Sequence, residues 1–134
     1  MNFDQLNKKI NDNFIKGNFK ESLKDLIQIY KQKKTSEISN KIGVILTKLN
    51  KKKFAENFFE KSTKENDNNF KPFFNLANLF KNTEVELSEK YIDQALSIEA
   101  KPEAKILKSH LLINKFKYIE AIKLLNNLNT AESN

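Results

Sequence analysis

The stretch FIKGNFKESLKDLIQIY, residues 14 to 30, decides the fold of this chain. It contains Gly17, one of only two glycines among 134 residues, directly before an amphipathic segment. In that segment Ser22, Leu26 and Ile29 recur at steps of four and three, which places them on one face of a helix. Glycine adopts positive φ without steric cost, so Gly17 predicts a tight turn that reverses the chain before this helix.

The same pattern recurs every 33 residues along the chain. The small residues at this spacing are Ser22, Ala55, Ser88 and Ala121, and the apolar residues four positions later are Leu26, Phe59, Ile92 and Leu125. A small side chain fits where two helices cross, because a larger one would push the axes beyond roughly 8–10 Å. The sequence therefore predicts four repeats, each with a helix that crosses a neighbour closely.

A second periodic segment precedes each of these helices. It is clearest at residues 70 to 82, where Phe73, Leu76, Ala77 and Phe80 form an apolar stripe. In residues 38 to 50 the stripe consists of Ile42, Gly43 and Leu46. Each repeat is therefore predicted to be a pair of helices.

Turn and capping signals support this division. Pro72 and Pro102 stand where the first helices of two pairs are expected to begin, a place that tolerates proline. Residues 66 to 69, with the sequence NDNN, predict a loop between repeats. Thr83 and Glu86 are spaced as a capping box, with Thr83 as the predicted N-cap.

The chain resembles the tetratricopeptide repeat family, whose pattern is W-x2-L-G-x2-Y, then A-x3-F, then P, over thirty-four residues. The match is good in Phe73, Leu76, Ala77 and Phe80, and the small residue with its apolar follower is present in all four repeats. The resemblance implies one all-α domain over residues 1–134, with repeats at about 3–35, 36–69, 70–101 and 102–131. It implies a right-handed superhelical solenoid of antiparallel helix pairs, with about eight helices.

Four lysine and asparagine residues depart from the family pattern. Lys9 and Asn13 in the first repeat, and Lys105 and Lys108 in the fourth, stand where apolar residues are expected. These departures lie in the first helices of the first and last repeats and do not change the predicted fold class.

Composition argues for one soluble, cytoplasmic domain. The chain is 39% hydrophobic and has no cysteine, so we expect neither a disulfide nor a thiolate metal site and place the protein in a reducing compartment. No stretch approaches the roughly 20 apolar residues that span a bilayer. The net charge is +7, yet every basic residue is a lysine, and the absence of the arginine fork argues against nucleic-acid binding.

The sequence offers no catalytic constellation. His110 is the sole histidine, so it cannot form a histidine-based metal site or triad in a chain without cysteine. The two glycines lie far apart, which excludes a glycine-rich phosphate loop, and the acids Glu84, Glu86 and Glu89 suit the positive end of a helix dipole. We therefore predict a protein that is not an enzyme and carries no cofactor or metal.

In the family, the first helices of the pairs line a concave groove that holds peptides or partner proteins. Some members hold a C-terminal carboxylate with a clamp of Lys, Asn, Asn, Lys and Arg; Asn11 and Lys71 match two of these places here. Asn7, Lys41 and Asn75 occupy the other three, so polar solvated helix faces remain an alternative. The predicted groove residues are Asn7, Lys8, Asn11, Asn40, Lys41, Val44, Lys48, Lys71, Phe74, Asn75, Asn78 and His110.

Two classes of function follow from this pattern. The first is a scaffold or adaptor that binds a protein or peptide in the groove, with acidic or C-terminal carboxylate peptides as the expected ligands. The second is a structural or assembly module that self-associates or forms part of a longer chain. The last helix pair would form such a homo-oligomer, because apolar residues spread over more than one face of its second helix. These residues are Ile119, Ile122, Leu124, Leu125 and Leu128.

Overall fold

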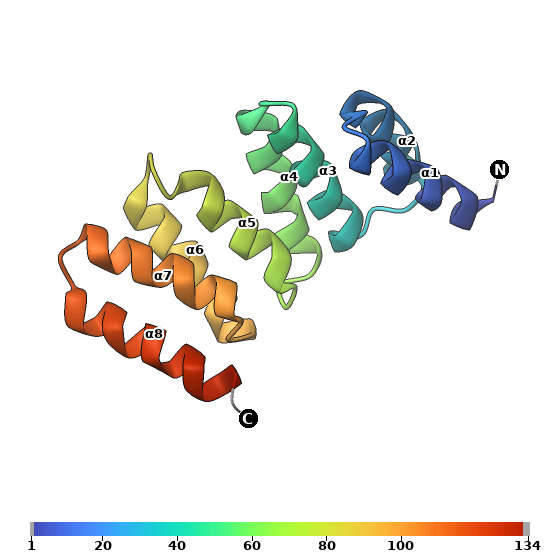
Figure 1. The fold of residues 1–134 in the computed structure, drawn as a ribbon. Helices are drawn as coiled ribbons and strands as arrows, with labels where there is room; N and C mark the ends of the chain where they lie inside the picture. The colour runs from blue at the N-terminus through green and yellow to red at the C-terminus, as the bar shows by residue number, and fades with distance from the viewer. Residues whose placement is uncertain (1, 133–134) are drawn as a thin grey trace. The chain divides into compact units, whose positions relative to one another are not determined.

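The computed structural model describes residues 2–132, and these contain helices and turns but no strand. Eight helices follow one another, as expected for four helix pairs (Figure 1). They are α1 (Phe3–Ile15), α2 (Phe19–Gln32), α3 (Ser36–Lys48), α4 (Lys52–Glu65), α5 (Phe70–Phe80), α6 (Val85–Ile98), α7 (Pro102–Asn114) and α8 (Tyr118–Glu132). The predicted all-α class of antiparallel helix pairs is confirmed.

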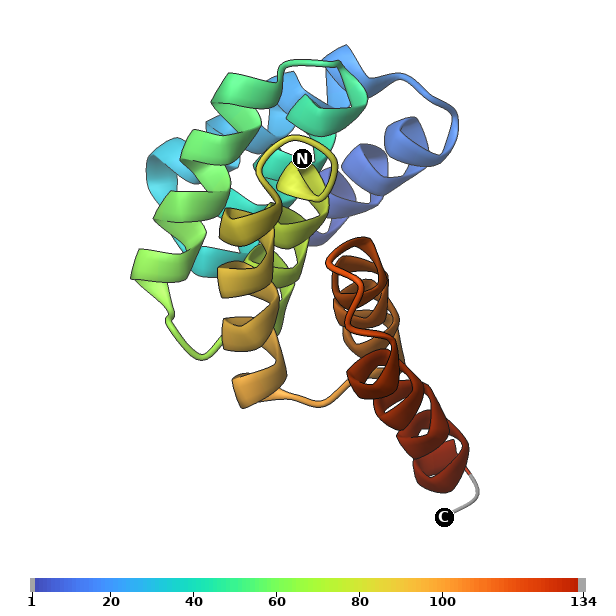
Figure 2. The ribbon, with the colours of Figure 1, turned by 90° about the vertical axis from the view of Figure 1, so that its left-hand side faces the viewer.

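The chain divides into two compact units, and the boundary lies within α5. Unit 1 comprises residues 1–72, in which α2 packs against α1 and α3, and α3 packs against α4. Unit 2 comprises residues 73–134, in which α7 packs against α6 and α8. Helices α7 and α8 run side by side in both views of this unit (Figures 1 and 2).

The small residues at the 33-residue spacing lie at buried helix contacts, as predicted. Ser22, Ala55 and Ser88 are 0% exposed and Ala121 is 1% exposed. The Ser22 hydroxyl donates to the carbonyl oxygen of Ile10 at 2.8 Å, and the Ser88 hydroxyl donates to that of Ala77 at 2.6 Å. Each serine therefore binds its helix to the backbone of the preceding one.

In three of the four pairs, the turn between the two helices contains a residue in the left-handed backbone conformation. Gly17 has φ +82°, and the residues 33 and 99 positions further on, Asn50 and Phe116, both have φ +61°. In each case the next N–H donates to a carbonyl five residues back, as from Asn18 to Asn13 at 2.7 Å. This is the bond of a Schellman turn, so the predicted role of Gly17 is confirmed.

The third pair closes differently, and the predicted capping box is wrong. Helix α6 begins at Val85, and Glu84 is its N-cap, without a side-chain capping bond. The N–H groups of Thr83 and Glu84 both donate to the carbonyl oxygen of Phe80, at 3.1 and 2.9 Å. Thr83 therefore belongs to the turn that ends α5 rather than to the start of α6.

Two of the lysines that break the repeat pattern are paired with acids of a neighbouring helix. Lys9 of α1 lies 3.2 Å from Asp25 of α2, whose side chain is 10% exposed. Lys108 of α7 lies 3.1 Å from Glu89 and 2.8 Å from Asp93, both on α6. A charge at an otherwise apolar helix contact is tolerated when an opposite charge meets it.

The charges between α6 and α7 shift each other's protonation. The side-chain hydrogen bond from Lys115, together with Lys108, lowers the pKa of Glu89 against the opposing effect of burial. Burial works to lower the pKa of Lys108, but its hydrogen bonds to Asp93 and Glu89 outweigh this effect and raise it. This α6–α7 ion network therefore favours the charged form of both groups.

Candidate functional site

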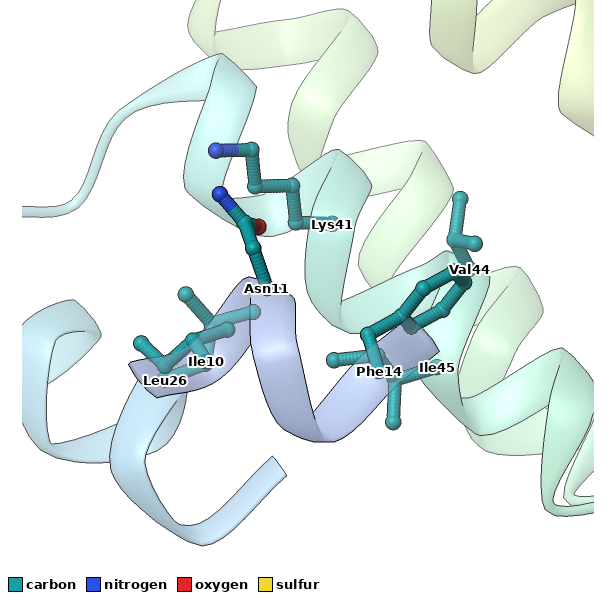
Figure 3. Close-up of a pocket in the computed structure, with 7 residues that line it drawn as sticks. All are labelled: Ile10, Asn11, Phe14, Leu26, Lys41, Val44 and Ile45. Atoms are coloured by element: carbon teal, nitrogen blue, oxygen red, sulfur yellow. The ribbon is translucent and has the colours of Figure 1, made fainter. Parts of the chain in front are cut away.

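An apolar cavity of about 150 Å³ lies in unit 1 between α1, α2 and α3 (Figure 3). Ile10, Leu26 and Ile45 are at most 4% exposed and form the buried part of its wall. The remaining wall residues are Asn11 and Phe14 of α1 and Lys41 and Val44 of α3. The Phe14 ring points toward Val44 and Ile45 in Figure 3. The cavity can therefore accept an apolar group.

Two polar side chains lie at the mouth of this apolar cavity. Asn11 and Lys41 are exposed, and their side chains point in the same direction in Figure 3. Neither makes a side-chain hydrogen bond or ion pair with any residue that the structure describes. The amide of Asn11 can donate and accept, and the Lys41 ammonium can donate three hydrogen bonds. Both groups are available to a carboxylate beside the apolar cavity.

A second cavity of about 410 Å³, with a mixed polar and apolar lining, adjoins the first through Leu26 and Lys41, which line both. It contains charges of both signs, since Lys33 and Lys41 face the same space as Glu37 and Glu65. Its remaining residues are Phe3, Asn7, Thr35, Ser36, Ile38 and Asn66. We call the two cavities together the α1–α3 site.

The structure brings four of the predicted groove residues together. Asn7, Asn11, Lys41 and Val44 line the α1–α3 site, where three of the five clamp-like positions therefore meet. The exposed lysines Lys8, Lys48 and Lys71 of unit 1 line neither cavity.

Asn40 differs from the expectation of a groove-facing side chain. It is 6% exposed, so its amide is buried within the fold and not open to a ligand. The remaining predicted residues belong to unit 2. Phe74 and Asn75 of α5 are half-buried, while Asn78 of α5 and His110 of α7 are exposed.

Sequence reasoning identified only part of the wall of the apolar cavity, namely Asn11, Lys41 and Val44. Ile10 and Phe14 were absent from the predicted site, and Leu26 entered only as a core residue of the repeat pattern. The recurrence of apolar residues marks a buried face, but a cavity appears only when three helices are placed together. Lys33, the C-cap of α2, was missed because it lies outside the first helices of the pairs.

Within residues 2–132, no three acidic or histidine side chains come together in a way that could hold a metal ion. None of the helices in this range has the length and apolar character needed to cross a membrane.

Several solved structures are similar to this chain over most of its length. A crystal structure of MamA matches with a TM-score of 0.85 at 15% identity, over 98% of this chain and 79% of MamA. MamA of Desulfovibrio magneticus RS-1, from residue 41 to its end, matches with a TM-score of 0.81 at 12% identity, over 97% and 75% of the two chains.

A third similar structure is that of YrrB, described as a TPR protein with an unusual peptide-binding site. It matches with a TM-score of 0.71 at 14% identity, over 87% of this chain and 62% of YrrB. No protein-family model matches the sequence, and the search of curated proteins found no match. At such low identity the likeness establishes the fold alone. The chain has the tetratricopeptide repeat fold predicted from its 33-residue period.

Proposed function

We propose that this protein is a non-catalytic scaffold that binds a peptide segment of a partner protein at the α1–α3 site. An apolar side chain of the peptide would enter the apolar cavity, and a carboxylate would bind Asn11 and Lys41. One observation carries the proposal: an apolar cavity opens directly beside two polar groups that have no partner among the described residues.

The size of the apolar cavity suits a single side chain. A cavity of about 150 Å³ lined by apolar groups can hold a benzene-sized molecule. Burying one large aliphatic or aromatic side chain contributes about 1.5–3 kcal/mol. The ammonium of Lys41 adds attraction for an acidic group, which increases the rate of encounter. A total near −8 kcal/mol, or roughly micromolar affinity, is the scale expected without an arginine or tryptophan anchor.

Two further observations support an acidic peptide ligand. The net charge of +7 attracts negatively charged segments over a longer range than the site itself. YrrB, which shares the fold, is described as having a peptide-binding site. We further propose a cytoplasmic location, because the chain has no cysteine. The lysines Lys8, Lys48 and Lys71 would contact parts of the peptide beyond the α1–α3 site.

Charge reversal at Lys41 tests this proposal. A panel of short labelled acidic peptides with one apolar residue, each made with a free and with an amidated C-terminus, would be titrated and followed by fluorescence anisotropy. Lys41→Glu should weaken binding by at least about tenfold, since it opposes the carboxylate. Lys24→Glu is the matched control, because Lys24 is an exposed lysine of α2 that lines neither cavity.

The two peptide forms separate the ligand classes. Loss of affinity on amidation indicates a C-terminal carboxylate, whereas equal affinity indicates an internal acidic residue. Val44→Asp should weaken both forms, because a charge would face the apolar cavity. Equal affinities of the parent, Lys41→Glu and Val44→Asp proteins would place the binding site elsewhere.

A second candidate function is assembly of several copies of the chain. Exposed apolar residues on α7 and α8 favour it, including Ile113, Ile119 and Ile122, which are 40%, 71% and 55% exposed. Measuring the mass of the protein in solution as a function of concentration tests this function directly. The result of this measurement is independent of whether the protein binds a peptide.

A further inference from the structure

The outward side of α8, with the turn before it, carries a cluster of exposed apolar side chains. Ile119 is 71% exposed, Ile122 is 55% exposed and Leu125 is 39% exposed. Tyr118 is 51% exposed, and Phe116 of the turn is 78% exposed with its ring 6.1 Å from that of Tyr118. We call these residues the α8 outer face. All of them belong to unit 2.

The equivalent positions of the other repeats show that this cluster is not a property of the fold. The positions equivalent to Ile119 are Lys20, Lys53 and Glu86, and all three are exposed and charged. The positions equivalent to Ile122 are Leu23, Glu56 and Glu89, of which two are charged. Only in α8 are both positions apolar. An exposed apolar patch of this kind indicates an interaction surface.

A further repeat packed after α8 would cover only part of this face. The positions equivalent to Leu125 are Leu26, Phe59 and Ile92, which are 1%, 2% and 0% exposed. Leu26 shares the wall of the apolar cavity with residues of α3, the first helix of the following pair. The positions equivalent to Ile119, however, stay exposed in the earlier pairs. To cover Ile119, Ile122 and Leu125 together, another helix must lie along α8 itself.

We propose that the α8 outer face binds the same face of a second copy, with the two α8 helices antiparallel about a twofold axis near Ile122. This inference specifies the surface for the second candidate function and is independent of the peptide site. In this arrangement Ile122 meets its own counterpart, and Ile119 of one copy meets Leu125 of the other. The face is therefore its own complement, as an isologous interface requires.

The face of α1 that corresponds to the buried isoleucine face of α3 is not an apolar surface for a copy. Helix α3 receives the preceding pair with Ile38, Ile42 and Ile45, which are at most 9% exposed. The equivalent positions of α1 are polar: Gln5, Lys9 and Asp12. Stacking the α8 outer face on α1 would therefore bury charges against isoleucines, which is costly, and a head-to-tail array is disfavoured.

The area of the α8 outer face is sufficient for a dimer of modest strength. From their exposed fractions, its side chains present roughly 400–500 Å² of apolar surface, so two copies would bury on the order of 1,000 Å². Specific interfaces begin at about this size. We therefore expect a dimer that dissociates on dilution.

Sedimentation of the full chain over a wide concentration range tests the proposal. The parent should approach twice the mass of one chain as concentration rises. The double variant Ile119→Lys, Ile122→Glu introduces the residues that repeat 2 carries at these positions, Lys53 and Glu56, whose side chains lie 3.9 Å apart. It should keep its helicity and remain monomeric. The control Phe54→Glu changes an exposed apolar residue of α4, 60% exposed, and should dimerise like the parent.

Disulfide formation tests the twofold axis. Because the chain has no cysteine, Ile122→Cys can cross-link only to a second copy. Two such thiols near the axis can meet the Cα separation of about 4.4–6.8 Å that a disulfide needs. Oxidation should give a covalent dimer, whereas Phe54→Cys should stay largely monomeric.

Three results would overturn the proposal: a parent that stays monomeric up to millimolar concentration, a double variant that associates like the parent, or Ile122→Cys that cross-links no better than Phe54→Cys. Peptide titration of the double variant keeps the two functions apart. The double variant should bind peptide as the parent does, which would show that its loss of dimerisation is not caused by damage to the α1–α3 site. Conversely, if the parent bound no peptide, the sedimentation and cross-linking results would still test the dimer.

Discussion

The two glycines of the chain are required for different physical reasons. Gly17 has φ +82°, and a Cβ at this residue would meet no atom within 4 Å, so its requirement is conformational. Gly43 has no such backbone requirement, but a Cβ there would lie 2.5 Å from Cε1 of Phe59. Gly43 thus allows the ring of Phe59, which is 2% exposed, to pack directly on α3.

This difference predicts that Gly43 is energetically coupled to Phe59 in a double-mutant cycle, whereas Gly17 is not. Gly43→Ala should lower the free energy of unfolding by about 1–3 kcal/mol through overpacking. Adding Phe59→Leu should recover part of that loss, because the smaller side chain removes the clash. Gly17→Ala should cost about 1–2 kcal/mol, and its effect should add to that of Phe59→Leu. Urea unfolding measures the parent and all five variants. An additive Gly43–Phe59 cycle would contradict the contact.

Phe116 predicts a stabilising substitution. A bulky residue at φ +61° is strained, whereas asparagine adopts this region more readily and occupies it at the equivalent Asn50. Phe116→Asn should therefore raise the free energy of unfolding by about 1 kcal/mol. The thermal midpoint should be compared at low protein concentration, where association through the α8 outer face contributes little. A lower midpoint would show that the contact of Phe116 with Tyr118 outweighs the strain.

At the scale of single elements, the α6–α7 ion network replaces apolar packing at a helix contact. Lys108 stands where the repeat pattern has an apolar residue, and α6 provides Glu89 and Asp93 to meet it. The first pair uses the same solution with Lys9 and Asp25. Such charges also favour one alignment of the two helices over others, because a shift would leave the lysine unpaired.

The network predicts the pH dependence of stability. The pKa of Glu89 is lowered from 4.5 in the folded state. The carboxylate of Glu89 therefore contributes to the free energy of unfolding above pH 4.5, and this contribution is lost as pH falls through the folded-state pKa. The pKa of Lys108 is raised from 10.5, so its contribution is present below pH 10.5 and is lost as pH rises through the folded pKa.

Glu89→Gln should therefore destabilise the protein at pH 7 by about 1–3 kcal/mol and reduce the loss of stability in acid. Glu86→Gln is the control, because Glu86 is an exposed acid of the same helix with no ion pair among the described residues. Chemical unfolding at pH 3, 7 and 11 measures both. Equal acid profiles of the parent and Glu89→Gln proteins would contradict the role of this carboxylate.

The helices could be predicted from sequence because the side chains that form them are close together in it. Ser22 and Ala55 marked the helix contacts correctly, and Gly17 marked the turn. Thr83 misled the prediction because a threonine followed by an acid three positions later occurs in turns as well as at helix starts. Asn40 and the apolar cavity were beyond prediction, since burial of an amide and the space beside Phe14 depend on how several helices pack.

At the scale of the whole molecule, the net charge of +7 favours one proposed interaction and opposes the other. Salt screens the attraction between the basic chain and an acidic peptide, and it also screens the repulsion between two basic copies. Raising sodium chloride from about 50 to 500 mM should therefore weaken peptide binding several-fold and strengthen dimerisation. Anisotropy and sedimentation measure these trends on one preparation. A dimer weakened by salt would indicate ion pairs rather than apolar burial at the α8 outer face.

The second helix pair has an additional use in protein engineering. The hydroxyls of Ser36 and Ser62 donate to each other's backbone carbonyls, at 2.8 and 2.6 Å, and join the start of α3 to the end of α4. At the opposite end, Asn50 closes the pair with a left-handed turn. The two helices of this pair are therefore joined at both ends by contacts within the pair. It is the natural module from which to build longer artificial arrays, in which the number of copies would set the length of a rigid spacer.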